Sequence, residues 1–284
     1  MATFTILGAD GFVGSSLAEH LETHGHACQR VGRQDSKPEY LGHVVFAIGL
    51  TADFRTRPFD TIEAHVSALL PILRPGGFDS FTYLSSTRVY GNLDPNTVAD
   101  EAADLTVNSN RPSDLYNISK LAGESLCLSV PNETVRIARL SNIYGAQDRS
   151  QNFLTAVLRD AVAGRQPQFF NAMGSAKDYI DVRDVVQALE IIALRGKSRV
   201  INVAAGQNVS DREIAALIEK HTGRVPSTKN GTSEIRFPPI SIQRMVAETG
   251  VRPRALTEGF PMLIEGLRPD LPTHAKSEGG IRLP

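Results

Sequence analysis

The sequence contains no tryptophan, only two cysteines and no large excess of either charge. Cys28 and Cys127 lie far apart and match no metal-binding or redox spacing, so we expect free thiols in a reducing compartment, the cytoplasm. The net charge of -1 gives no electrostatic reason to expect a nucleic acid or an anionic membrane as partner. No apolar run approaches the roughly 18–20 residues that cross a bilayer, so no membrane span is predicted.

The amino-terminal residues also lack the marks of a signal peptide. The chain runs from Met1 directly into an apolar strand pattern, without a basic segment or a cleavage site. Hydrophobic residues make up 41% of the sequence and charged residues 21%, as is typical of a globular protein with a substantial core. We therefore expect a soluble protein.

Apolar strand patterns alternate with helical patterns, which is typical of an α/β fold with a doubly wound, mainly parallel sheet. Strands are predicted at Phe4–Leu7, Ala27–Val31, Val44–Ile48, Phe81–Leu84, Val135–Arg139 and Val200–Val203. Helices are predicted near Phe12–Thr23, Thr61–Leu73, Asn117–Leu128, Phe153–Ala163, Val185–Leu194 and Asp211–His221. Only about ten residues separate Arg33 from the next strand, whereas a complete crossover unit takes about thirty. The sheet is therefore predicted to be trimmed by one strand after the second.

A glycine-rich turn follows the first predicted strand. Gly8, Gly11 and Gly14 share this turn with Phe12 and Val13. A turn without side chains lets backbone N–H groups approach a pyrophosphate, and the following helix adds its partial positive charge. These five residues are thus predicted to bind a dinucleotide cofactor. Their spacing differs from the G-x-G-x-x-G fingerprint and resembles that of extended short-chain dehydrogenase/reductases, which implies a Rossmann-type fold.

The end of the second strand bears on the choice of nicotinamide cofactor. A carboxylate there would hydrogen-bond the adenosine ribose and repel a 2′-phosphate. In the register of the family that place falls on Gly32, and Arg33, a phosphate-matching guanidinium, follows it. NADP(H) is therefore predicted in preference to NAD(H), with Arg33 as a cofactor-binding residue and Arg30 nearby. Asp35 remains an alternative acid that would favour NAD(H).

Tyr116 and Lys120 lie four residues apart at the start of a predicted helix, so their side chains share one helical face. A phenol has a pKa near 10, and lowering it to about 7 takes roughly 4 kcal/mol of phenolate stabilisation. An adjacent ammonium is a suitable source of that stabilisation. In the family that this pattern resembles, the lysine also holds the nicotinamide ribose. Ser86, about thirty residues upstream, completes a predicted catalytic triad.

The segment Ser85–Gly91 resembles the Ser-Ser-x-x-Val-Tyr-Gly segment of nucleotide-sugar epimerases. The resemblance implies that Ser86 polarises the substrate oxygen and that Thr87 lies against the substrate. Arg88 departs from relatives that dehydrate or 3,5-epimerise sugars, because an arginine cannot act as a general acid or base near pH 7. Of the reactions known in the family, hydride transfer at a single sugar carbon, C4, remains compatible with Arg88. Arg88 is predicted to contact a carboxylate or phosphate of the substrate, the alternative being an ion pair with Asp100 or Glu101.

The resemblance continues almost to the end of the chain. Asn142 lies in a segment that resembles Arg-x-x-Asn-x-Tyr-Gly, and Asn152 opens a predicted helix. Lys177 stands where the family has an arginine, which keeps the charge and loses the bidentate fork. Arg236 is a candidate for the arginine that grips a diphosphate. All four are predicted substrate-binding residues, with helix or turn capping as the alternative for the two asparagines.

Three histidines have no assigned chemistry. His20 and His24 lie at helical spacing, but no third ligand is apparent, so a solvated helix face is preferred and no metal site is predicted. His65 occupies a place where the family often has an active-site asparagine, which indicates a supporting polar role.

The domain boundaries follow from the same resemblance. Residues 1–145 plus about 180–206 are predicted to form the NAD(P)-binding domain, and 146–179 plus 207–268 the substrate-binding part. Residues 269–284, rich in glycine and proline, are expected to be a flexible tail. A homodimer formed through two helices beside the sheet is implied by the family alone.

The leading functional hypothesis is NADPH-dependent reduction of a keto group on a nucleotide-linked sugar. The first alternative is 4-epimerisation with a retained cofactor, in which Tyr116 takes a proton instead of giving one. A second alternative is the same chemistry on a ketone without a nucleotide. A third, from a different class, is a catalytically silent NADP-binding regulatory protein; the intact set of Ser86, Tyr116 and Lys120 argues against it.

Overall fold

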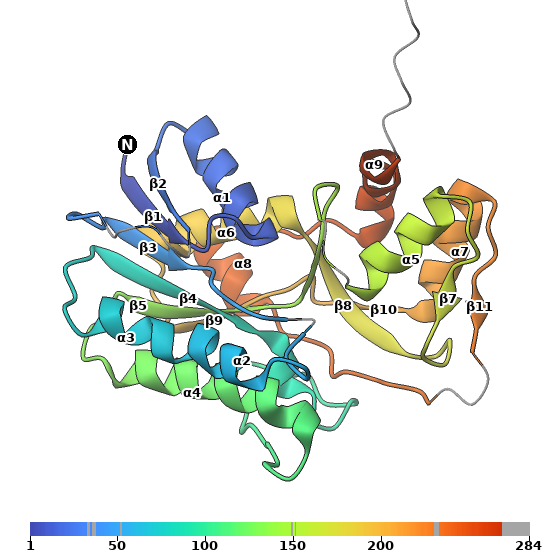
Figure 1. The fold of residues 1–284 in the computed structure, drawn as a ribbon, viewed down its shortest axis with the longest axis horizontal. Coiled ribbons are helices and arrows are strands. Elements are labelled where there is room, and N and C mark those ends of the chain that lie inside the picture. Colours follow the sequence, from blue (N-terminus) through green and yellow to red (C-terminus); the bar gives the residue numbers. More distant parts are fainter. Residues whose placement is uncertain are drawn as a thin grey trace, which may run out of the picture.

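The computed structural model describes residues 1–268 except 33, 34, 36, 37, 52, 149, 151 and 230–232. The predictions for Arg33 and for the tail 269–284 therefore lie outside the described residues. Two layers of helices enclose a central sheet, and a smaller part lies beside it (Figure 1).

Six parallel strands form the central sheet in the order β2-β1-β3-β4-β5-β9. They are β1 (Thr3–Leu7), β2 (Ala27–Val31), β3 (His43–Phe46), β4 (Ser80–Ser86), β5 (Val135–Leu140) and β9 (Val200–Val203). All six predicted strands are present. Within the described residues β2 is an edge strand, and β3 follows it without an intervening helix, which confirms the predicted trimming of the sheet.

Helices cover both faces of this sheet (Figure 1). One face carries α1 (Phe12–Thr23), α6 (Val182–Arg195) and α8 (Gln243–Thr249); the other carries α2 (Pro58–His65), α3 (Leu70–Leu73) and α4 (Leu115–Ser129). Short 3-10 helices are η1 (Ser67–Leu69), η2 (Thr87–Tyr90) and η3 (Pro112–Asp114). Because both faces are covered, central strands are buried along their length, as in β5, where even Arg136 and Arg139 are buried.

The single helix predicted at Thr61–Leu73 is instead divided into α2, η1 and α3. Val66, with φ -127° and ψ -60°, interrupts the helical backbone. Pro71 explains the break, because a continuous α-helix would need a backbone N–H from it to Ser67 and would place its ring against that carbonyl.

The smaller part has its own apolar core, formed around Tyr144, Phe169 and Phe260. Its helices are α5 (Phe153–Val162), α7 (Asp211–Thr222) and α9 (Leu256–Leu267). Its strands are β6 (Asn142–Tyr144), β7 (Gln168–Phe169), β8 (Ala176–Asp181), β10 (Asn208–Ser210) and β11 (Ser227–Thr228). They pair as β10-β8-β6 and β11-β7. Within the described ranges no helix has the length and apolarity to cross a membrane.

Candidate functional site

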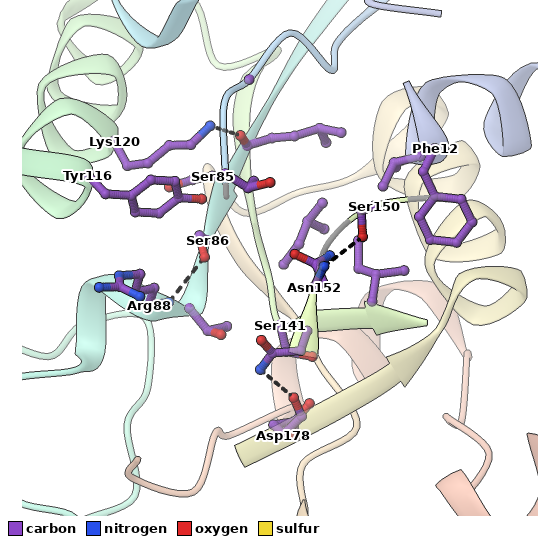
Figure 2. A pocket seen from close by; sticks show the side chains of 18 of the residues that line it. Phe12, Ser85, Ser86, Arg88, Tyr116, Lys120, Ser141, Ser150, Asn152 and Asp178 are labelled. Atoms are coloured by element: carbon purple, nitrogen blue, oxygen red, sulfur yellow. Dashed lines mark hydrogen bonds between the residues drawn. The ribbon is translucent and has the colours of Figure 1, made fainter. Parts of the chain in front are cut away.

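A cleft of about 430 Å³ opens where the carboxyl ends of the central strands face the smaller part. Parallel sheets place ligands at this edge because helix amino termini and loop side chains converge there. The cleft brings together most of the residues that the sequence predicted. They are Gly11, Phe12, Val13, Gly14, Ser86, Thr87, Arg88, Tyr116, Lys120, Asn142, Asn152 and Lys177. Phe12 lies across the cleft from Tyr116 and Arg88 (Figure 2).

Two described residues of the prediction do not line this cleft. Gly8 lies beneath it, with φ +89°, and a Cβ there would come 2.9 Å from the backbone of Ala47. Arg236 lies on a short bridge to Ala176, where its exposed side chain pairs with Glu234. Arg236 therefore has an acid partner in the structure, and its predicted contact with a diphosphate stays a prediction.

The glycine turn fits a dinucleotide. The N–H of Gly11 donates to the carbonyl of Gly8 at 3.1 Å, and a Cβ on Gly14 would overlap that same carbonyl oxygen. Gly11 is the N-cap of α1 and offers no side-chain cap, so the first N–H groups of the helix are available to an anion. Phe12, Val13 and Gly14 present this turn to the cleft, as predicted for a pyrophosphate.

The end of β2 presents a carboxylate. The N–H of Gly32 donates to Asp35 at 2.7 Å, and a Cβ at Gly32 would meet Asp10 at 2.9 Å. Arg30 is engaged elsewhere, in a two-point ion pair with Glu22. The described residues at this point thus suit a ribose hydroxyl, and the predicted preference for a 2′-phosphate depends on Arg33.

The three predicted catalytic side chains come from adjoining elements. Ser86 ends β4, and Tyr116 and Lys120 lie one turn apart in α4, both almost fully buried. The ammonium of Lys120 donates to the carbonyl of Leu84 at 2.9 Å (Figure 2), and burial lowers the Lys120 pKa to about 7. The hydroxyl of Ser86 accepts from the N–H of Arg88 at 3.2 Å. Serine and phenol thus line one wall of the cleft.

The phenol of Tyr116 differs from the expectation in its electrostatics. Burial raises its pKa, while a hydrogen bond with Ser86 and the positive charge of Arg88 act to lower it. The Arg88 guanidinium carbon lies 5.7 Å from the centre of the Tyr116 ring. The sequence assigned the lowering to Lys120; in the structure Arg88 is the charged neighbour that opposes burial.

The side of the cleft formed by the smaller part is polar. The amide of Asn142 donates to the carbonyl of Asp178 at 2.8 Å. Asn152 is the N-cap of α5, but its side chain makes no capping bond. Lys177 on β8 lies with its ammonium 5.6 Å from the centre of the Phe153 ring.

The model of the "NAD dependent epimerase/dehydratase family" matches residues 27–204, more than half of the chain. The protein belongs to this family. GDP-6-deoxy-D-mannose reductase of Pseudomonas aeruginosa is 31% identical over 163 residues, which cover 53% of this chain and 51% of that protein. The match thus spans about half the length of that relative.

Solved structures with similar folds cover nearly the whole chain. MoeE5 in complex with UDP-glucose and NAD superposes with a TM-score of 0.81, at 24% identity, over 94% of this chain and 98% of that one. RMD from Pseudomonas aeruginosa, complexed with NADPH, has a TM-score of 0.80 at 22% identity, over 94% and 99%. These likenesses confirm the predicted Rossmann-type fold.

In this member of the family His65 supports α4, the helix that carries Tyr116 and Lys120. It is fully buried; its Nε2 accepts from the N–H of Leu50 at 3.1 Å, and its Nδ1 lies 2.8 Å from the Ser119 hydroxyl. Ser119 in turn donates to the carbonyl of Tyr116. Burial, with the charge of Lys120, lowers the His65 pKa to about 3. A neutral His65 thus ties the loop after β3 to the start of α4.

Sequence reasoning missed Phe54, a buried residue that contacts both Tyr116 and Arg88. Its ring centre lies 5.5 Å from that of Tyr116 and 5.3 Å from the Arg88 guanidinium carbon, with Arg55 at 4.7 Å. A single phenylalanine in a loop carries no periodic signal, so only the fold could reveal this contact.

The structure also supplies the third group that was missing beside His20 and His24. Glu190 on α6 lies with them, and one ligand atom of each falls within 4.8 Å of the others. Its two carboxylate oxygens already contact His20 at 2.6 Å and His26 at 3.2 Å. Glu190 is far away in sequence, which is why the spacing of the histidines did not disclose it. We interpret the cluster as a link between α1 and α6.

Proposed function

We propose that this protein is an NADPH-dependent oxidoreductase that reduces a keto group, at C4, of a nucleoside-diphosphate sugar. The observation that carries the proposal is the placement of Ser86, Tyr116 and Lys120 in the same cleft as the glycine turn. Similarity to GDP-6-deoxy-D-mannose reductase, and to GDP-L-fucose synthase 1 of Arabidopsis thaliana at 24% identity over 254 residues, supports a reductase.

Each residue has a role in this reaction. NADPH, when bound on the glycine turn, supplies the hydride. The substrate oxygen accepts hydrogen bonds from Ser86 and Tyr116, and Tyr116 then gives it a proton. The raised pKa of Tyr116 suits this direction, because the phenol stays protonated at neutral pH. The phenolate that remains is stabilised by Ser86 and the charge of Arg88, and Lys120 positions the nicotinamide ribose.

Nucleotide-sugar 4-epimerisation is the second candidate. Similarity to UDP-glucose 4-epimerase of Mycolicibacterium smegmatis, 25% identical over 263 residues, supports it, and so does the Asp35 carboxylate, which suits NAD. The two reactions differ in stoichiometry, since an epimerase consumes no cofactor.

Three further features belong to the same proposal. Residues 1–145 plus about 180–206 bind the cofactor, and 146–179 plus 207–268 bind the substrate. The protein forms a homodimer through α2 and α4. It works in the cytoplasm, where the free thiols Cys28 and Cys127 remain reduced.

The test of this function combines binding with turnover. The protein is melted with NADP or NAD and with UDP, GDP and dTDP; NADPH oxidation is then followed with 4-keto sugars of the nucleotides that stabilise it. We expect turnover with NADPH, and a Tyr116→Phe variant whose kcat falls by roughly 10²–10⁴ with its melting temperature nearly unchanged.

Tyr179→Phe is the matched control, because the Tyr179 hydroxyl is buried without a hydrogen-bond partner and lies outside the residues that line the cleft. It should retain full activity. Equal losses in the two variants would contradict the role of Tyr116. Conversion of a nucleotide sugar to its 4-epimer without net cofactor consumption would favour the second candidate.

A further inference from the structure

Arg88 is a half-buried cation in the wall of the cleft. Its guanidinium lies against the rings of Phe54 and Tyr116, and its Nε is buried without a hydrogen-bond partner. Among the described residues it forms no ion pair. The acids near it are engaged elsewhere: Asp100 accepts from the N–H of Ala102, and Glu101 accepts from the N–H of Asn202. The charge of Asp114 acts to raise the Arg88 pKa against the effect of burial, but its carboxylate accepts from the Asn92 amide and the N–H of Asn108.

The other charges of the cleft leave this one uncompensated. Asp178 accepts three backbone N–H groups, from residues 205–207, and Asp148 accepts from Ser150 and Thr155. Lys177 is a second cation in the same cleft: burial lowers its pKa, the charge of Asp211 acts to raise it, and the charge of Arg88 acts to lower it. Two like charges therefore share a partly dehydrated space.

Such an arrangement is costly in the free protein. A buried cation is normally paired, since an unpaired charge is unfavourable away from water. Desolvation lowers the pKa of Arg88 and of Lys177. A bound anion would offset this cost at Arg88.

The position of Arg88 identifies its anion. It lies over the ring of Tyr116, the residue that contacts the reacting oxygen in the proposed function, whereas Lys177 lies on β8 beside Phe153. The diphosphate of a nucleotide sugar begins at C1, across the ring from C4. A sugar substituent that contacts Arg88 while C4 lies against Tyr116 must therefore be attached to a ring carbon next to C4.

We infer that the sugar recognised by this protein carries a carboxylate next to its reacting carbon, as in a nucleotide-linked uronic acid, and that Arg88 binds it. This inference rests on the proposed function. Arginine is suited to the role because its guanidinium matches a carboxylate at two points and stacks on aromatic faces. Lys177 is left for the diphosphate.

The experiment compares ligands that differ at one carbon. Dissociation constants are measured by calorimetry, with NADP present, for UDP-glucose against UDP-glucuronic acid and for GDP-mannose against GDP-mannuronic acid, with UDP and GDP alone as references. We expect the acidic sugar to bind roughly 10- to 100-fold more tightly than its neutral twin, as for a hydrogen bond to a charged group.

Substitutions then test whether Arg88 is the residue that causes the preference for the acidic sugar. Arg88→Met should bring the affinity for the acidic sugar down to that for its neutral twin in the same variant, and Arg88→Lys should restore part of the difference. Arg55→Met is the matched control: Arg55 stacks on the same Phe54 but does not line the cleft, so the preference should survive.

The outcomes separate this inference from the proposed function. Equal affinity for acidic and neutral sugars in the wild-type protein would overturn the inference and leave the proposed function standing. An Arg88→Met variant that changes only the pH profile of turnover, and not the preference for the acidic sugar, would also overturn the inference, because Arg88 would then act solely on Tyr116. If no nucleotide or nucleotide sugar binds, both fall together.

Discussion

His65 illustrates how the candidate site depends on a residue that does not line the cleft. Its ring is fully buried, meets the ring of Tyr116 edge-on at 5.3 Å, and is held by Leu50 and Ser119. With a folded-state pKa of about 3, it is neutral at every pH at which the protein would be assayed. A charged ring there would face the ammonium of Lys120 and lose the bond from Leu50.

This burial predicts a pH-dependent stability. Below the ordinary histidine pKa of about 6.5 the unfolded chain takes up a proton that the folded state refuses, so stability is complete above pH 6.5 and falls towards pH 3. His65 should contribute a loss of about 2 kcal/mol in the free energy of unfolding between pH 6.5 and pH 5. Urea unfolding at the two pH values measures it.

Two variants isolate the effect of this histidine. His65→Gln should be less stable at pH 7.5 but show a shallower dependence on pH. His24→Gln, at an exposed histidine, should keep the wild-type dependence. Identical slopes in His65→Gln and the wild-type protein would contradict the assignment.

Residues whose chemistry restricts the choice of side chain could be predicted from the sequence. The glycines of the turn, and Ser86 with Tyr116 and Lys120, lie where the motifs indicated. Phe54 could not be predicted, because its role depends on contacts with segments more than thirty residues away. The pairing of Arg236 with Glu234 depends likewise on local rotamers and not on a pattern.

At the scale of elements, the unit formed by β1, the glycine turn and α1 leads us to expect different effects from substitutions at Gly14 and Gly11. Gly14 lies inside α1, where a Cβ would overlap the Gly8 carbonyl, so Gly14→Ala should destabilise the fold by about 1–3 kcal/mol. Gly11 has φ -78°, and its Cβ would lie 3.4 Å from the same oxygen, an ordinary contact. Gly11→Ala should therefore fold normally.

Cofactor binding should also distinguish Gly11→Ala from Gly14→Ala, but here Gly11→Ala is the variant expected to be impaired. Gly11 lines the cleft, so a methyl group there should raise the dissociation constant for NADPH by roughly tenfold, about 1.4 kcal/mol. Thermal melting reports the stability, and fluorescence titration reports the affinity. A Gly11→Ala variant that binds NADPH as tightly as the wild-type protein would show that the turn does not approach the pyrophosphate.

Apart from β8 and α8, the strands and α-helices that escaped prediction are short or locally unfavourable. Strands β6, β7, β10 and β11 have two or three residues each, too few to show an alternating pattern. Helix α9 contains Gly259, Pro261 and Gly266, which lower helix propensity. Tertiary packing explains the glycines, since a Cβ on Gly259 would come 2.6 Å from the Tyr144 hydroxyl.

At the scale of the whole molecule, the doubly wound sheet could be predicted because its strands contain short apolar runs and, apart from β2 and β3, are separated by helical patterns. The smaller part could not be built in the same way, because its core joins α5, α7 and α9 from segments up to about a hundred residues apart. Its side of the cleft is polar, so the same packing leaves Lys177, Asn142 and Asn152 facing the glycine turn.

The proposed homodimer makes a prediction about the surface of α2. Phe59 is 87% exposed and Ile62 is 38% exposed, and the helix packs beside α4, where Leu128 is also exposed. Apolar side chains on two adjacent helices fit an isologous interface, in which each copy presents the same patch. Phe59→Asp should convert the dimer to a monomer, as measured by size-exclusion chromatography with light scattering.

Met262 provides the matched control for this interface. It is 52% exposed but lies on α9, in the smaller part, on the side of the molecule away from α2 and α4 (Figure 1). Met262→Asp should therefore remain dimeric, because a charge there meets no partner copy. A monomeric wild-type protein at 100-fold above assay concentration would refute the dimer, and dissociation caused by Met262→Asp alone would move the interface to α9.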